Sequence, residues 1–201
     1  MDFILTAGKN PESVYHFCKT LGIEEADFYR HFSSFASIET SAWADTLTGV
    51  LQKLEANEDY ANFGIREKLL SFFFALTEEM RSQRSFFIRS SANWFIPGKA
   101  SAAKNALEQE VKPFFEKLVA EGFQTGELAD RAKISDYYPR AMMVQFWFII
   151  QFWMTDESRD FEDTDAAIEK GVNLGFDLMK ENTLDKAFDL AKFLWGRAKT
   201  R

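Results

Sequence analysis

Residues 13–32 (SVYHFCKTLGIEEADFYRHF) carry the polar side chains whose types and spacing best suit a binding function. Two short segments with apolar faces flank Leu21-Gly22-Ile23, and a glycine between two such segments is typical of a helix-turn-helix. In that motif the second helix lies in the major groove of DNA, with its first residues at the base edges. The candidate DNA-binding residues are therefore Ser13, Lys19, Glu24, Glu25, Asp27, Tyr29, Arg30 and His31.

The charge of this segment opposes DNA binding. Glu24, Glu25 and Asp27 would direct carboxylates at a polyanion, whereas affinity for duplex DNA depends largely on cations that neutralise phosphates. Residues 1–47 carry three lysines and arginines against seven acidic residues, a net charge of −4 within a chain total of −7. We therefore expect weak and poorly specific DNA binding. The groups able to reach phosphates are Lys9, Lys19, Arg30 and His31.

A second set of residues suits an amphiphilic ligand. Residues 80–107 contain no acidic residue. Their cations are interleaved with aromatic side chains, namely Arg81, Arg84, Arg89, Lys99 and Lys104 with Phe86, Phe87, Trp94 and Phe95. Guanidinium groups at the mouth of an aromatic pocket would bind a carboxylate or phosphate, with an acyl tail among the rings. The alternative is a solvated arginine face above aromatic residues that belong to the core.

Other chemistry has little support in the sequence. It contains no nucleophile elbow, phosphate-binding loop or dinucleotide-binding glycine pattern, so no enzymatic activity is predicted. His16 and His31 are the two histidines and lack zinc-site spacing, so neither a metal nor another cofactor is expected. Cys18, the single cysteine, excludes an internal disulfide and fits a reducing compartment. We expect it to fill a small buried slot.

The sequence also predicts a cytoplasmic location. Met1–Asn10 lacks the pattern of a secretion signal. The uncharged run Ala141–Met154 spans 14 residues, which is below the ~17–25 residues that a membrane-spanning helix needs. We therefore expect no transmembrane segment and interpret this run as a buried helix.

The elements that would position these residues are all expected to be helices, since no strand alternation is visible. Capping residues and apolar spacing predict a long helix from Ser33 or Ser34 to about Glu55. Further helices are expected over 65–80, 82–95 and 101–121, with Pro113 as a kink or boundary and Gly122–Gly126 as a loop. The last three expected helices cover 136–155, 162–181 and 183–198, with a polar turn at 156–160.

The helix-turn-helix segment resembles the DNA-binding domain of TetR-family regulators. The pattern Gly22-Ile23-x-x-Ala26-x-Phe28-Tyr29-x-His31-Phe32 matches that family at Gly22, Tyr29, His31 and Phe32. It departs at Glu24, where Ser or Thr is usual, and at Phe35, where a phosphate-contacting lysine is usual. The resemblance implies an all-α, TetR-like fold. A small N-terminal three-helix helix-turn-helix domain over 1–47 would precede a larger helical ligand-binding and dimerisation domain over 48–201.

The expected helix over 136–155 is apolar on all faces, so it must be covered on all sides. In the TetR family two helices in this part of the chain form a four-helix bundle with a partner subunit. The resemblance therefore implies a homodimer through 136–155 and 162–181, whereas the alternative is a core helix in a monomer. One stripe would face the partner and another the ligand cavity: Phe146, Ile149 and Trp153, and Met143, Trp147 and Ile150, respectively.

These observations predict a ligand-responsive transcriptional regulator with a weakened DNA reader. It would sense an apolar or amphiphilic small molecule through Phe73, Arg84, Trp94, Phe95, Phe115, Met143 and Trp147. Ligand binding would tilt the long fourth helix and change the spacing of the two readers in a dimer. The alternative is a lipid- or isoprenoid-binding carrier on the same fold that no longer binds DNA, by analogy with ubiquinone-biosynthesis accessory proteins.

Overall fold

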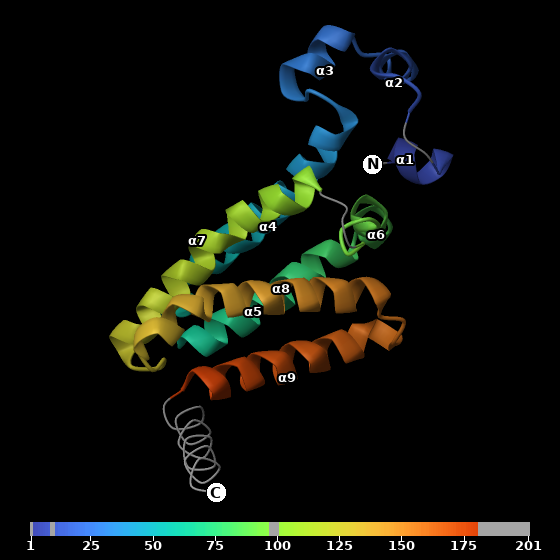
Figure 1. The fold of residues 1–201 in the computed structure, drawn as a ribbon. Coiled ribbons are helices and arrows are strands. Elements are labelled where there is room, and N and C mark those ends of the chain that lie inside the picture. Colours follow the sequence, from blue (N-terminus) through green and yellow to red (C-terminus); the bar gives the residue numbers. More distant parts are fainter. Residues whose placement is uncertain (1, 9–10, 97–100, 181–201) are drawn as a thin grey trace, which may run out of the picture. The chain divides into compact units, whose positions relative to one another are not determined.

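A computed structural model describes residues 2–8, 11–96 and 101–180, and every regular element within these ranges is a helix (Figure 1). The predicted all-α fold is confirmed for this part of the chain. The helix expected over 183–198 lies outside the described residues.

The helices follow one another through short connections. The α-helices are α1 (Asp2–Ala7), α2 (Val14–Leu21), α3 (Glu25–His31), α4 (Phe35–Glu55), α5 (Ile65–Arg81), α6 (Arg84–Ser91), α7 (Ala102–Thr125), α8 (Tyr138–Thr155) and α9 (Glu162–Met179). Short 3-10 helices are η1 (Glu58–Asn62), η2 (Ala132–Tyr137) and η3 (Arg159–Phe161). Helix α6 is shorter than the expected 82–95, whereas the expected long fourth helix is confirmed.

Helix α7 differs from its expected form because two residues that usually interrupt helices are accommodated. It continues through Pro113, whose exposed position lets water bind the carbonyl group that loses its N–H donor. It also extends past Gly122, so the loop expected over 122–126 is wrong. A Cβ atom at Gly122 would collide with the side chains of Ile65 and Leu128. This glycine therefore serves close helix packing and does not end the helix.

The chain forms two compact units. The first unit contains residues 1–53 and 75–111, and the second contains residues 54–74 and 112–201. Helices α4, α5 and α7 contribute residues to both units. The boundary expected at residue 47 falls inside α4, and the division into domains of 1–47 and 48–201 stays a prediction.

Helix α4 is capped at its start and packed along the first unit. The Ser34 and Ser37 side chains each accept a hydrogen bond from the other residue's backbone N–H, both at 3.1 Å. This reciprocal cap satisfies N–H groups that a helix start leaves unpaired. Further along, the buried Trp43 donates its indole N–H to Ser90 Oγ at 2.9 Å. Its ring centre also lies 4.6 Å from that of Phe87, so α4 is anchored to α6.

An aromatic core holds the second unit together. The fully buried ring of Phe72 lies 4.7 Å from Phe114, 6.0 Å from Phe115 and 6.3 Å from Phe146, measured between ring centres. These rings come from α5, α7 and α8. Removing one such side chain from water contributes about 1.5–3 kcal/mol, so this cluster stabilises the second unit.

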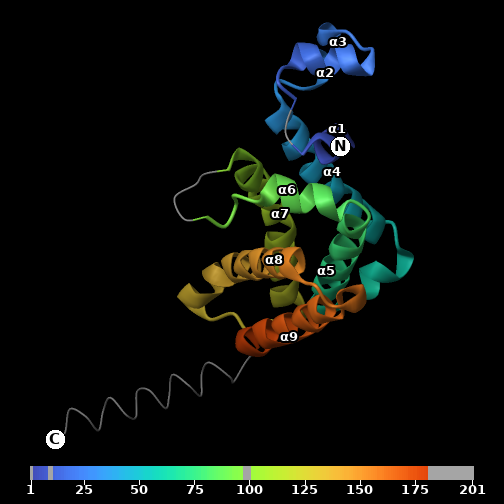
Figure 2. The ribbon, with the colours of Figure 1, turned by 90° about the vertical axis from the view of Figure 1, so that its right-hand side faces the viewer.

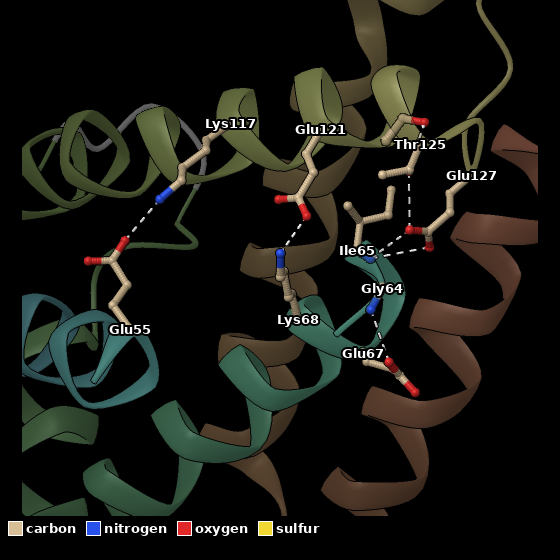
Figure 3. A network of polar contacts seen from close by, with 10 residues as sticks. Glu55, Gly64, Ile65, Glu67, Lys68, Lys117, Glu121, Thr125 and Glu127 are labelled. Carbon is tan, nitrogen blue, oxygen red and sulfur yellow. Dashed lines mark hydrogen bonds and ion pairs between the residues drawn. The ribbon is translucent and has the colours of Figure 1, made fainter. Parts of the chain in front are cut away.

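Carboxylates link the start of α5 to the end of α7 in the second unit (Figure 3). The Glu127 carboxylate accepts the backbone N–H of Ile65 at 3.2 Å, and the buried ammonium group of Lys68 pairs with Glu121. Lys68 also lies over the ring of Tyr60, 5.7 Å from its centre. Burial raises the pKa of the Tyr60 hydroxyl to about 12, and the Glu55 and Glu121 carboxylates add to the shift.

Helices α8 and α9 run side by side in opposite directions (Figures 1 and 2). The buried Asp156 carboxylate fixes the turn between them by accepting the N–H groups of Ser158 at 2.7 Å and Thr164 at 2.9 Å. Burial alone would raise the pKa of Asp156, but hydrogen bonds from Ser158 and Thr164 outweigh it and lower the pKa to about 2. The charged carboxylate therefore serves as the N-terminal anchor of α9.

The opposite end of this helix pair is held by Arg131. Its guanidinium group donates to the carbonyl oxygens of Leu178 at 3.1 Å and Met179 at 3.4 Å, and it also contacts the Lys180 carbonyl. The same group donates to the Tyr138 hydroxyl at 3.0 Å, at the start of α8. Carbonyl groups at a helix C-terminus attract cations, so Arg131 ties the end of α9 to the start of α8.

Candidate functional site

The predicted helix-turn-helix forms as α2 and α3. The Ser13 hydroxyl accepts the His16 N–H at 3.1 Å and caps α2. Gly22 ends α2 with φ 69°, a left-handed conformation that favours glycine. Helix α3 begins at Glu25, and Phe28 is its buried residue. The glycine turn between two short helices, which the sequence predicted, is therefore present in the structure.

Aromatic rings build the core of this motif. The centre of the Phe17 ring lies 6.1 Å from that of Phe28 and 5.4 Å from that of Phe35. Phe35, at the position where the resembled family has a phosphate-contacting lysine, therefore contributes to packing. Cys18 is buried, as expected. Burial raises the pKa of its thiol, and the carboxylates of Glu25, Asp27 and Glu24 raise it further.

The surface of the motif is exposed and its cations have partners. Glu24, Glu25 and Asp27 are all exposed. The Arg30 guanidinium lies 3.0 Å from the Asp27 carboxylate, so part of its charge is already balanced. Lys19 lies over the exposed Tyr15 ring, 5.9 Å from its centre. This surface offers few cations for phosphate neutralisation.

Three further candidate DNA-binding residues lie at the start of α2 and on α3, namely Ser13, Tyr29 and His31. Ser13 is exposed and holds the helix start through its hydroxyl oxygen. Tyr29 is 56% exposed and meets the Phe28 ring edge to face. His31 is exposed at the end of α3, with its ring tilted against Phe32. All eight candidates thus lie on one small motif, and their contact with DNA stays a prediction.

The candidate ligand-binding residues are divided between the two units. Arg84, Trp94 and Phe95 belong to the first, whereas Phe73, Phe115, Met143 and Trp147 belong to the second. Trp94, Phe73 and Phe115 are buried, and the other four are partly exposed. The Trp94 ring centre lies 4.6 Å from that of Trp43, and the Lys104 ammonium lies 5.1 Å from the centre of Phe95. Trp94 therefore fills core space in its unit.

A groove of about 920 Å³ runs between α8 and α9 in the second unit. Its walls are mainly apolar, with Val144 and Phe148 exposed on α8 and Leu174 and Leu178 exposed on α9. The seven candidate ligand-binding residues do not line this groove. Exposed apolar side chains gathered around one depression mark a binding or association surface.

Gln145 is one of the polar residues that line the groove. Its side-chain amide lies against two glycines of α9, because a Cβ at Gly171 would be 3.3 Å from its Nε2 and one at Gly175 would be 3.6 Å from its Oε1. The Nε2 group is buried and has no hydrogen-bond acceptor within the described residues. The glycines therefore leave room for an amide whose donor capacity is unused.

The stripe of α8 that was expected to face a partner is a core stripe instead. Phe146, Ile149 and Trp153 are fully buried within the chain, as is Ile150. Most of the exposed or partly exposed α8 residues that line the groove lie on another face, among them Ala141, Val144, Gln145 and Phe148. The expectation was wrong because α8 is apolar all round, so the sequence contained no polar stripe to mark its outer side.

Two properties of the described residues limit the chemistry. None of the helices in these ranges is long and apolar enough to cross a membrane. No group of three or more His, Cys, Asp or Glu side chains within the same ranges is arranged to hold a metal ion.

Together these features define an all-α protein with an N-terminal helix-turn-helix and a helical C-terminal part. A comparison with protein-family models matched residues 68–194 to the tetracycline repressor-like C-terminal domain. Because the match covers more than half of the chain, the protein belongs to the tetracycline repressor-like, or TetR, family of regulators. Searches of curated proteins and of solved structures found no match to the chain.

Proposed function

We propose that this TetR-family protein is a non-enzymatic, ligand-responsive transcriptional regulator that acts in the cytoplasm as a homodimer and binds DNA weakly. The observation that carries the proposal is the presence, in one chain, of a capped helix-turn-helix and the family's C-terminal domain. The motif supplies a way to contact DNA. The C-terminal domain supplies surfaces for association and for a small molecule.

The groove between α8 and α9 supports the homodimer. Both helices belong to the region matched by the family model, and they are the two helices for which the sequence predicted association. The groove combines exposed ridges, such as Leu174, with the depression between the two helices. Ridges and depressions on one surface allow a copy of that surface to interlock with it in a twofold arrangement.

The exposed carboxylates of α3 support weak DNA binding. Each phosphate contact that is missing lowers the salt dependence of DNA binding by about one unit of slope. Arg30 must exchange its 3.0 Å contact with Asp27 for a phosphate, and this exchange costs part of the Coulomb energy gained. We infer micromolar affinity with little preference among duplex sequences.

The aromatic and cationic residues support an apolar or amphiphilic ligand. In the first unit Arg84 lies on α6 and Lys104 lies on α7, and Trp94 and Phe95 lie between these helices in the sequence. The Lys104 ammonium group lies 5.1 Å from the centre of the Phe95 ring. In the second unit Phe73, Phe115, Met143 and Trp147 offer apolar surface. We propose that each unit offers ligand contacts of its own, with Arg84 for an anionic group in the first unit and the partly exposed Met143 and Trp147 for an apolar group in the second.

A titration of labelled duplexes tests the DNA part of this proposal. Fluorescence anisotropy against random and genomic duplex pools at physiological salt should give micromolar dissociation constants with little sequence preference. Nanomolar binding to one palindromic sequence would contradict the inferred weakness of the reader. In that case the carboxylates of Glu24 and Glu25 would have to accept hydrogen bonds from cytosine amino groups.

The exposed acidic surface of α3 also favours a second candidate function, a lipid- or isoprenoid-binding carrier that no longer contacts DNA. Mass spectrometry of organic extracts of the purified protein, combined with the DNA titration, separates the two. A co-purified lipid together with no measurable DNA binding even at low salt would favour the carrier. A lipid whose addition changes the DNA affinity would favour the regulator, since a ligand acts only through its different affinities for two states.

A further inference from the structure

Two charged residues line the groove between α8 and α9, and their spacing indicates how a second copy of the chain would lie on it. This inference rests on the proposed homodimer. Asp163 and Lys170 are the charged residues of the groove wall, and both are exposed. No ion pair joins either of them to another residue in the described ranges. Each therefore has its charge available to a partner.

The two residues are symmetrically placed about a pair of small side chains. They are seven positions apart on α9, about two helical turns or ~10 Å along its axis, so they lie on one face. Ala166 and Ala167 lie midway between them and also line the groove. Small side chains at this midpoint allow another helix to approach closely.

We propose that Asp163 of one protomer pairs with the partner's Lys170, and Lys170 with the partner's Asp163, about a twofold axis close to Ala166 and Ala167. A twofold interface uses the same patch twice, so a contact between two different positions occurs twice. Where antiparallel copies of α9 cross at the axis, positions at equal distances on either side of it face each other. The two charge pairs thereby fix the register of the dimer.

The alternative packing, α9 against α8 of the second copy, leaves these charges without partners. The α8 residues that line the groove carry no charge, since they are tyrosine, alanine, methionine, valine, glutamine and phenylalanine. Asp163 and Lys170 would then lose water against an uncharged surface, which costs free energy unless a partner compensates. Charge complementarity therefore favours the pairing of α9 with its own copy.

The experiment uses two full-length variants with opposite charge, Asp163→Lys and Lys170→Asp, that carry tags of different mass. Each variant alone would place like charges opposite each other twice, whereas a mixed dimer would restore two attractive pairs. The two chains are mixed at equal concentration, equilibrated at low salt and analysed by native mass spectrometry. Glu169→Lys mixed with the wild type is the matched control, because Glu169 is exposed on α9 and does not line the groove.

Charge pairing at the twofold axis should enrich the mixed dimer. If like charges weaken each homodimer about tenfold, the mixture contains about nine-tenths heterodimer, compared with about one half for the control. The enrichment should fall at 0.5 M salt, because salt screens exposed charges. If the wild-type chain forms a dimer but the mixed variants show no excess of heterodimer, the proposed charge pairing is wrong and the homodimer is unaffected. A wild-type chain that stays monomeric at 100 µM would overturn the proposed homodimer as well.

Discussion

The helix-turn-helix surface and the α8–α9 groove both expose apolar side chains, but they do so in opposite electrostatic settings. On the motif, exposed Leu21 and Ile23 adjoin the carboxylates of Glu24 and Glu25. In the groove, Leu174 and other apolar residues surround one depression whose wall contains two charges of opposite sign. Scattered apolar groups among charges remain solvated, whereas a gathered apolar surface gains free energy when a partner covers it.

This difference suggests that association is the better supported property of the chain and DNA binding the weaker one. The family match covers the region that contains the groove, residues 68–194, and does not include the motif. The aromatic core of the motif shows that its fold is maintained by packing, for example of Phe35, although its charge does not suit DNA. Fold and charge can therefore be tested separately in each region.

The largest expected effect follows from placing a charge in the groove. Leu174→Asp introduces two carboxylates into the proposed interface, one from each copy, and removes apolar contact from both. We expect the dissociation constant of the dimer to rise about a thousandfold, or ~4 kcal/mol. Sedimentation equilibrium measures it. Leu21→Asp, at a similarly exposed leucine of the motif, is the control and should leave the association unchanged. Equal effects of the two variants would remove the distinction between the regions.

The next effect tests whether the motif depends on its own aromatic core. Phe28→Ala removes a buried ring that packs against Phe17 and Phe35, and we expect a loss of about 3 kcal/mol of local stability. Hydrogen–deuterium exchange should show faster exchange in α2 and α3, with unchanged dimer mass. Dissociation of the dimer by this substitution would show that the two regions are not independent.

The sequence predicted the motif well because local signals determine it. Ser13 and Gly22 mark the ends of α2, and the serines before Phe35 mark the start of α4. These signals act within one helical turn. The role of Phe35 could not be inferred in the same way, because its contact with Phe17 depends on how the helices pack in three dimensions.

The groove was only partly predictable. The sequence analysis predicted that α8 and α9 contact a second copy of the chain. It placed Phe146 in the stripe that faces this partner, but Phe146 is fully buried within the chain. A helix without a polar face gives no periodic signal for its orientation. The pairing of the Gln145 amide with Gly171 and Gly175 joins residues of two helices, and single-sequence periodicity does not report such contacts.

A smaller effect concerns the turn that holds the two groove walls together. Asp156→Asn removes the charge that binds the N–H groups of Ser158 and Thr164, and we expect about 2 kcal/mol lower stability at pH 7. Urea unfolding at fixed protein concentration measures it. Asp45→Asn, at an exposed position of α4, is the control and should change stability little.

The pH dependence sharpens this test. The pKa of Asp156 is lowered in the folded protein to about 2 from 3.8. Its stabilising contribution is therefore complete above pH 4 and is lost as the pH falls from about 4 towards 2. The variant should lack this part of the acid dependence. A variant that loses stability with falling pH as steeply as the wild type would show that the Asp156 carboxylate does not anchor the turn.

The smallest expected effect concerns the charge of the reader. Asp27→Asn removes the carboxylate 3.0 Å from Arg30 and leaves the guanidinium available to a phosphate. Because Asp27 is exposed and the helix core is untouched, folding should be unaffected. One additional phosphate contact should increase the slope of log affinity against log salt by about one unit and strengthen non-specific binding severalfold.

Glu58→Gln makes the same change in net charge outside the motif and should alter the slope little. Anisotropy titrations of a random duplex at several salt concentrations provide the slopes. Equal slopes for both variants and the wild type would mean that Arg30 does not reach DNA, and the carrier function would then gain support.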